Sequence, residues 1–166
     1  MEELLIALDS YDDIFSDFDI RDYKERAISV DLLHELRRRL RQTPYPSKLV
    51  FTVPKHRRVK RDERKVVKRL KAFFRQRAER IRREISDRRR QGITYFLIGF
   101  IIYLGLLWVE MHITVLEPLY DFALFPSWYL AWLGFDKLLS TFSKDNYYER
   151  LAALPIEFEN EEDYED

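Results

Sequence analysis

An uncharged stretch of membrane-spanning length, preceded by arginines, constrains this chain more than any other feature. The stretch covers residues 91–109, QGITYFLIGFIIYLGLLWV, and it directly follows Arg88, Arg89 and Arg90. Nineteen residues of α-helix extend about 28 Å, close to the ~30 Å thickness of the hydrocarbon core of a bilayer. Basic residues beside a membrane span stay on the cytoplasmic side. The sequence therefore predicts both a membrane span and its orientation.

The net charge of zero hides four blocks of different charge. Residues 1–33 carry a net charge of −7, residues 34–92 one of +17, residues 93–135 one of −3 and residues 136–166 one of −7. The basic block can pair with the acidic ends of the same chain. It can also bind anionic lipid headgroups, with a binding free energy of about 1 kcal/mol for each Lys or Arg near the membrane surface. Nucleic acid is the weakest alternative, because the block has neither an aromatic stacking platform nor a groove-reading module.

The basic block and the apolar stretch read as one helix, because no proline separates them. We predict a basic amphipathic helix over residues 61–91 and a first transmembrane helix over residues 92–112. One face of the basic helix is apolar and needs a cover, from an N-terminal helix of the same chain or of a neighbour. We predict an interaction surface there, formed by Val66, Leu70, Phe73, Phe74 and Ile81. The arginines predicted to lie at the membrane surface are Arg82, Arg83, Arg88, Arg89 and Arg90.

A second apolar region, FALFPSWYLAWLGF, lies between Asp121 and Asp136. Its length also suits a re-entrant or an interfacial helix, but three features favour a second transmembrane helix over residues 117–141. The connection to the first span is short, Lys137 suits the inner interface, and the tryptophans suit wet membrane edges. The predicted interfacial aromatic residues are Trp108, Trp128 and Trp132. This predicts a multi-pass protein of the cell membrane, inner or plasma, with both termini in the cytoplasm.

The remaining segments predict a small cytoplasmic α/β domain over residues 1–60. Residues 3–18 have the spacing of an acidic amphipathic helix, residues 24–29 suit a strand, and a leucine-lined helix precedes a strand over 48–54. A C-terminal helix and strand over residues 142–160 return to the domain, where the strand at 154–159 pairs with that at 48–54. The last residues, 161–166, are predicted to be a disordered acidic tail.

The predicted fold class is therefore a membrane protein, mainly α. It consists of a two-helix transmembrane hairpin, a small cytoplasmic α/β domain and a long basic helix that continues into the first span.

The residues that commonly carry chemistry are sparse. The chain has no cysteine and only four glycines, so thiol chemistry is excluded and no glycine-rich phosphate loop fits the soluble part. His34, His56 and His112 have no second ligand at metal-binding spacing on a shared helix face. We therefore predict a non-enzymatic protein with no catalytic, cofactor-binding or metal-binding residues and no cofactor.

Several stretches resemble a family of small uncharacterised prokaryotic two-span membrane proteins with a cytoplasmic N-terminal domain. The stretches are DDIFSDFDIRDYKERAISVDLLHEL, IRREISDRRRQG, PSWYLAWLGFDKLL and YYERLAALPIEF. The second span of that family carries a Gly-Trp-Val-Ala-Leu-Trp-Arg-Pro-type motif, whose Arg-Pro is replaced here by Gly134 and Phe135. The resemblance implies the two-span topology and carries no known function, and no role of that arginine transfers.

Together these features predict an integral membrane structural or interaction subunit. Its partners are the lipid bilayer and either further copies of itself, as a homo-oligomer, or a larger membrane complex. The alternative is a membrane-anchored tether that binds anionic lipid or nucleic acid through its basic helix.

Overall fold

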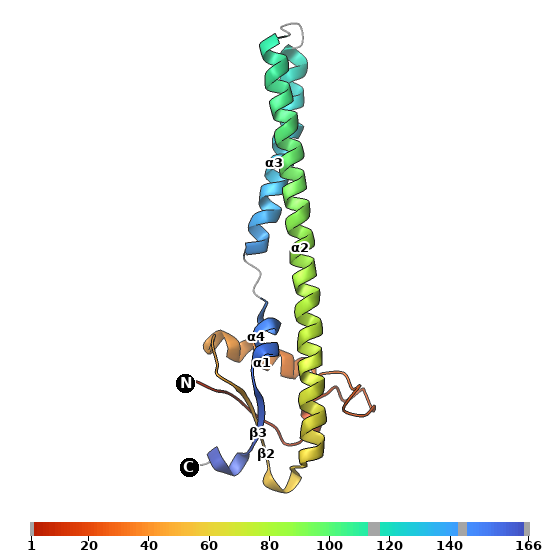
Figure 1. Cartoon of the computed structure of the whole chain (residues 1–166), viewed down its shortest axis with the longest axis vertical. Coiled ribbons are helices and arrows are strands. Elements are labelled where there is room, and N and C mark those ends of the chain that lie inside the picture. Colours follow the sequence, from red (N-terminus) through yellow and green to blue (C-terminus); the bar gives the residue numbers. More distant parts are fainter. Residues whose placement is uncertain (1, 113–116, 143–145, 165–166) are drawn as a thin grey trace. The chain divides into compact units, whose positions relative to one another are not determined.

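The computed structural model of the whole chain describes residues 2–112, 117–142 and 146–164 (Figure 1). The protein is mainly helical and has one small parallel sheet. It divides into two compact units. Unit 1 comprises Met1–Glu79 and Asn146–Asp166, and unit 2 comprises Arg80–Asp145. The predicted domain over residues 1–60 is thus only part of unit 1, which also takes in the start of a long helix and the C-terminal segment.

The sheet of unit 1 has three parallel strands in the order β1 (Leu4–Ala7), β2 (Leu49–Val53) and β3 (Ile156–Asn160). In the register, Leu49 lies opposite Leu4 on one side and Ile156 on the other. Every residue of β2 is buried, as expected for the apolar central strand of a parallel sheet. The predicted pairing of the C-terminal strand with the segment at 48–54 is confirmed.

The helix α1 (Val30–Gln42) connects β1 to β2. It buries Leu32, Leu36 and Leu40, which are spaced four residues apart and so share one helix face. The helix ends just before Pro44, because proline disfavours helical backbone at the residue that precedes it. The leucine-lined helix and the strand after it are therefore confirmed.

Two predicted elements of the N-terminal region are wrong. Residues 3–18 form β1 and then a 3-10 helix, η1 (Tyr11–Ile14), instead of an amphipathic helix. Leu4, Ile6 and Leu8 alternate along the chain and are all buried, which is the period of a strand. Residues 24–29 do not form a strand of the sheet, because β1 takes the place beside β2. Only an isolated antiparallel bridge joins Ile28 to Phe15.

The long helix is confirmed as α2 (Lys60–His112), which follows a short 3-10 helix, η2 (Lys55–Arg57). The helices α3 (Glu117–Phe142) and α4 (Tyr147–Ala153) come next, and both match predicted helices. A 3-10 helix, η4 (Glu161–Tyr164), follows β3 where the sequence predicts a disordered tail. The residues of α2 up to Glu79 belong to unit 1, and those from Arg80 onward belong to unit 2.

Candidate functional site

Small residues bring the two helices of unit 2 into backbone contact. Gly92 and Gly99 of α2 are buried, as are Ser127 and Gly134 of α3. A Cβ atom added at Gly99 would lie 2.7 Å from the backbone oxygen of Ser127, and one added at Gly92 would lie 3.0 Å from that of Gly134. The paired positions run in opposite directions along the two helices, which are therefore antiparallel. Both pairs are seven residues apart, a spacing that keeps small residues on one contact seam.

The outward faces of this helix pair are apolar and exposed. Among the described residues, α2 is the one helix that is long and apolar enough to cross a membrane, and only 11% of its most apolar segment is buried. The predicted interfacial residues Trp108, Trp128 and Trp132 are exposed by 60%, 68% and 61%. A soluble monomer rarely exposes a contiguous apolar surface of this kind. Exposed apolar surface of this kind marks either a protein–protein or a membrane interaction site.

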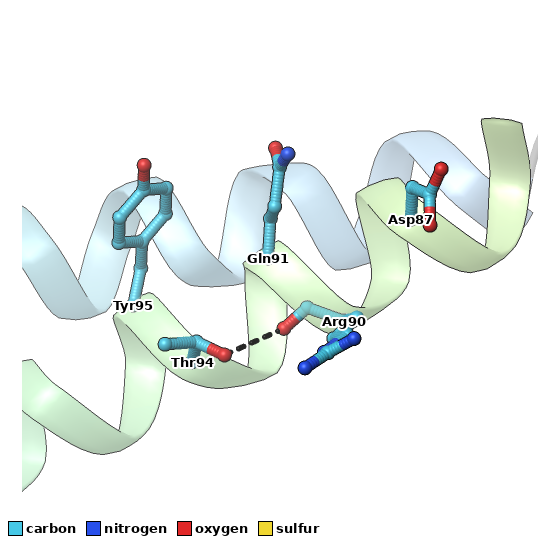
Figure 2. Close-up of a pocket in the computed structure, with 5 residues that line it drawn as sticks. All are labelled: Asp87, Arg90, Gln91, Thr94 and Tyr95. Atoms are coloured by element: carbon cyan, nitrogen blue, oxygen red, sulfur yellow. Dashed lines mark hydrogen bonds between the residues drawn. The ribbon is translucent and has the colours of Figure 1, made fainter.

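A polar pocket of about 380 Å³ lies where the arginines of α2 give way to the apolar segment (Figure 2). Asp87, Arg90, Gln91, Thr94 and Tyr95 line it. Figure 2 shows Gln91 and Tyr95 projecting in the same direction from α2. The Thr94 hydroxyl donates a hydrogen bond of 2.9 Å to the backbone carbonyl of Arg90, so this polar side chain is satisfied by its own helix.

The side chain of Lys137 links α3 to α2 at the start of the apolar segment of α2. Its ammonium donates a 3.4 Å hydrogen bond to Gln91 Oε1 and lies 5.6 Å from the ring centroid of Tyr95. Gln91 directly follows Arg90 in the sequence, so the one basic residue of α3 lies at the same level as the arginines of α2. The apolar segments of the two helices therefore have basic side chains at the same end.

The predicted surface arginines lie on the outside of unit 2. Arg82, Arg83, Arg88, Arg89 and Arg90 are all exposed. Their exposure places these side chains on the surface of the unit.

The predicted interaction face on α2 belongs mostly to the core of unit 1. Val66, Leu70 and Phe74 have no exposed surface, and Phe73 is half-buried. The ring of Tyr148 from α4 lies 6.4 Å from that of Phe74, so the chain's own C-terminal segment covers this face. The predicted cover of this face is an N-terminal helix of the same chain or of a neighbour; at Phe74 the cover comes from α4 of the same chain instead. Ile81, also half-buried, falls in unit 2 and is not part of that core.

The acidic ends of the chain pair in part with its basic block. Lys48, just before β2, lies 3.2 Å from a carboxylate oxygen of Glu3, 3.3 Å from one of Glu157 and 2.8 Å from one of Glu159. Hydrogen bonding, first to Glu159, raises the pKa of Lys48 above its usual range. One cation just before β2 is thus paired with the residue that precedes β1 and with two residues of β3. A second link runs from Arg58, which donates 2.9 Å hydrogen bonds to Glu63 and to the backbone carbonyl of Phe158.

All three histidines are exposed. His34 and His56 are exposed, and His112 stacks on Trp108 with its Nδ1 at 2.8 Å from the Trp108 carbonyl oxygen. In the part of the chain that the structure describes, no group of three His, Asp or Glu side chains is arranged to hold a metal ion.

Sequence reasoning missed a second hollow, of about 410 Å³, in unit 1. It is lined by Lys24, Arg64, Lys65, Lys68, Arg69 and Ala72. The four basic residues of α2 are visible in the sequence at i, i+4 spacing. The sequence did not show that Lys24, in the segment before α1, lies beside these residues, because residues 24–29 were predicted to form a strand.

Comparison of the chain with protein-family models, with curated proteins and with solved structures found no match. The resemblance to the family of small prokaryotic two-span membrane proteins therefore stays a prediction. What can be inferred about function comes from the geometry of the two units.

Proposed function

We propose that this chain is a non-enzymatic integral membrane protein in which α2 and α3 form a two-span hairpin. Unit 1 then serves as a cytoplasmic structural or interaction module of a homo-oligomer or of a larger membrane complex. The observation that carries the proposal is the construction of unit 2. It has small residues in its helix contact, apolar residues on its outer faces and basic side chains at one end.

The distribution of side chains in unit 2 is the reverse of that in a water-soluble helix pair. Large residues such as Ile101, which is 65% exposed, and Phe125, which is 82% exposed, face outward. The buried contact holds Gly92, Gly99 and Gly134. In a bilayer the outer faces contact lipid tails, and close backbone packing replaces the hydrophobic effect as the source of helix association. This supports a membrane location for both helices.

The shared basic end supports one orientation. Lys137 lies beside Gln91 and Tyr95, at the end of the apolar segment that Arg88, Arg89 and Arg90 precede. Basic residues at one end of both helices favour a cytoplasmic location for that end. Both chain termini would then lie in the cytoplasm, together with unit 1.

The role of unit 1 follows from its surfaces. Val66, Leu70 and Phe74 are used in its own core, so a partner must bind elsewhere on the unit or on the outer faces of the helix pair. A second copy of the chain and another membrane protein both fit such outer faces.

A second candidate function is contact with anionic lipid through the basic part of α2. The exposure of Arg82 and of residues 88–90 favours this candidate, because a guanidinium in solvent can bind a lipid phosphate in a bidentate manner. Such contacts would add to the anchoring by the spans.

A charge placed on the outer face of α2 tests the membrane proposal. The variant Ile101→Lys puts a lysine where lipid tails are expected, at a cost of ~2.5–3.5 kcal/mol for insertion. We expect the amount of protein in the membrane fraction after alkaline carbonate washing to fall sharply. Val59→Lys is the matched control, because Val59 is 47% exposed but lies in unit 1. Full recovery of Ile101→Lys as soluble, folded protein would contradict the proposal.

A further inference from the structure

The hollow in unit 1 is lined by five basic residues. Arg64, Lys65, Lys68 and Arg69 project from α2, and Lys24 comes from the segment before α1. No acidic residue lines the hollow, and its sixth lining residue is Ala72. Its volume of about 410 Å³ falls within the ~300–1,000 Å³ typical of small-molecule sites.

Two of the five cations are engaged by the protein itself. Lys65 pairs with Asp62 at 3.0 Å and with Asp22 at 3.7 Å. Arg69 donates hydrogen bonds to the backbone carbonyls of Arg26 and Glu25, at 3.1 and 3.3 Å. These contacts hold the segment that carries Lys24 against α2, so they fix the wall of the hollow.

The other three cations form no ion pair within the described residues, although the charge of Lys24 acts on the nearby carboxylate of Asp22. In the described part of the chain, no carboxylate lies within ion-pair distance of Lys24, Arg64 or Lys68. Arg64 and Lys68 are also like charges four residues apart on one helix face, an arrangement that destabilises a helix. A bound anion would compensate the repulsion between Arg64 and Lys68.

The chemistry of these side chains selects a phosphate group. The planar guanidinium of Arg64 matches two phosphate oxygens, and the ammonium groups of Lys24 and Lys68 add point charges. The aliphatic stems of the same residues supply apolar walls for whatever carries the phosphate.

We propose that this hollow is a binding site for a phosphate group, carried either by a small soluble molecule or by a lipid headgroup. The proposal concerns unit 1 alone and does not depend on how α2 and α3 meet the membrane. It is also distinct from the lipid contact suggested for residues 82–90, because none of those arginines lines the hollow.

Calorimetric titration of the full chain in phosphatidylcholine nanodiscs tests the site, at about 0.15 M salt so that weak surface attraction is screened. Two probes distinguish the sources of the phosphate. Inorganic pyrophosphate represents soluble ligands, and dioctanoyl phosphatidic acid represents lipid headgroups. The test variant is Arg64→Ala/Lys68→Ala. The matched control is Arg41→Ala/Lys55→Ala, which removes one arginine and one lysine that are exposed in unit 1 but lie outside the hollow.

We expect the wild type to bind at least one probe and the test variant to bind it about tenfold more weakly or worse, since two charge-assisted contacts are lost. The control should stay within about twofold of the wild type. Binding of pyrophosphate identifies a soluble ligand, whereas binding of phosphatidic acid alone identifies a lipid headgroup. Arg41 and Lys55 lie outside the hollow, and all four replaced residues are exposed, so folding should be unaffected in both variants. The proposal is overturned if the wild type binds neither probe, or if test and control variants weaken binding equally.

Discussion

The contact between α2 and α3 offers a sharp test in Gly99→Ala. The added Cβ atom would lie 2.6 Å from the backbone nitrogen of Ala131 and 2.7 Å from the backbone oxygen of Ser127, whereas ordinary contacts lie at 3.4–4 Å. Neither neighbour is the end of a flexible side chain that can rotate away. The helices must therefore move apart locally to admit one methyl group.

The cost follows from overpacking, which typically destabilises by ~1–3 kcal/mol. An alanine also has a helix propensity better than that of glycine by about 0.8–1.0 kcal/mol. Gly105→Ala is the matched control, because a Cβ atom there has nothing within 4 Å and only the propensity term remains. The free energy of unfolding of Gly99→Ala should therefore be lower than that of Gly105→Ala by ~1–3 kcal/mol. The upper value corresponds to a change of about a hundredfold in the unfolding equilibrium constant.

The assay is unfolding of the detergent-solubilised protein by added dodecyl sulfate, followed by tryptophan fluorescence. All three tryptophans of the chain, Trp108, Trp128 and Trp132, belong to unit 2, so the signal reports on the helix pair. If Gly99→Ala and Gly105→Ala unfold at the same dodecyl sulfate concentration, the close backbone contact does not exist and the reasoning is refuted.

Two further changes probe unit 1. Phe74→Ala leaves a cavity at a fully buried position and should lower the free energy of unfolding by ~3–5 kcal/mol. The control Phe73→Ala should lose less, because Phe73 is only half-buried. Equal losses of the two variants in chemical denaturation would contradict the core described above. Hydrogen bonds from Arg21 and from the backbone amide of Ala27 hold the pKa of Asp19 well below its usual range, so ionised Asp19 stabilises the fold at neutral pH. Asp19→Asn should therefore melt below the wild type at pH 7, and this difference should shrink as the pH falls below the unfolded value of about 3.9. A difference in melting temperature that does not change with pH would speak against ionised Asp19 as its source.

The parts of the fold that the sequence predicted well depend on local pattern. The long helix α2 follows from continuous helical spacing without proline, and β3 follows from an alternating segment after a helix. The N-terminal strand could not be separated from a helix by pattern. Leu4, Leu5 and Leu8 satisfy helical spacing, and Leu4, Ile6 and Leu8 satisfy strand spacing. Pairing with β2, 45 residues further along the chain, decides in favour of the strand.

The features of the candidate sites depend on which distant segments meet. The sequence shows that Phe74 lies on an apolar face but not that Tyr148 covers it. It shows four glycines but not that Gly99 lies in a helix contact while Gly105 lies in open space. The hollow likewise requires Lys24 to lie beside α2. Hydrogen bonds from Arg69 to the backbone carbonyls of residues 25 and 26 hold the segment of Lys24 there.

Cysteine accessibility in intact cells tests the two-span hairpin most directly, since the chain has no native cysteine. Three exposed positions suit single replacements: Ser86→Cys and Glu110→Cys at opposite ends of the apolar segment of α2, and Ser140→Cys near the end of α3. We predict that a membrane-impermeant maleimide labels only Glu110→Cys in intact cells, and that permeabilisation exposes the other two. Labelling of Ser140→Cys together with Glu110→Cys would mean that α3 does not return through the membrane, and no labelling of any variant before permeabilisation would contradict the spans altogether.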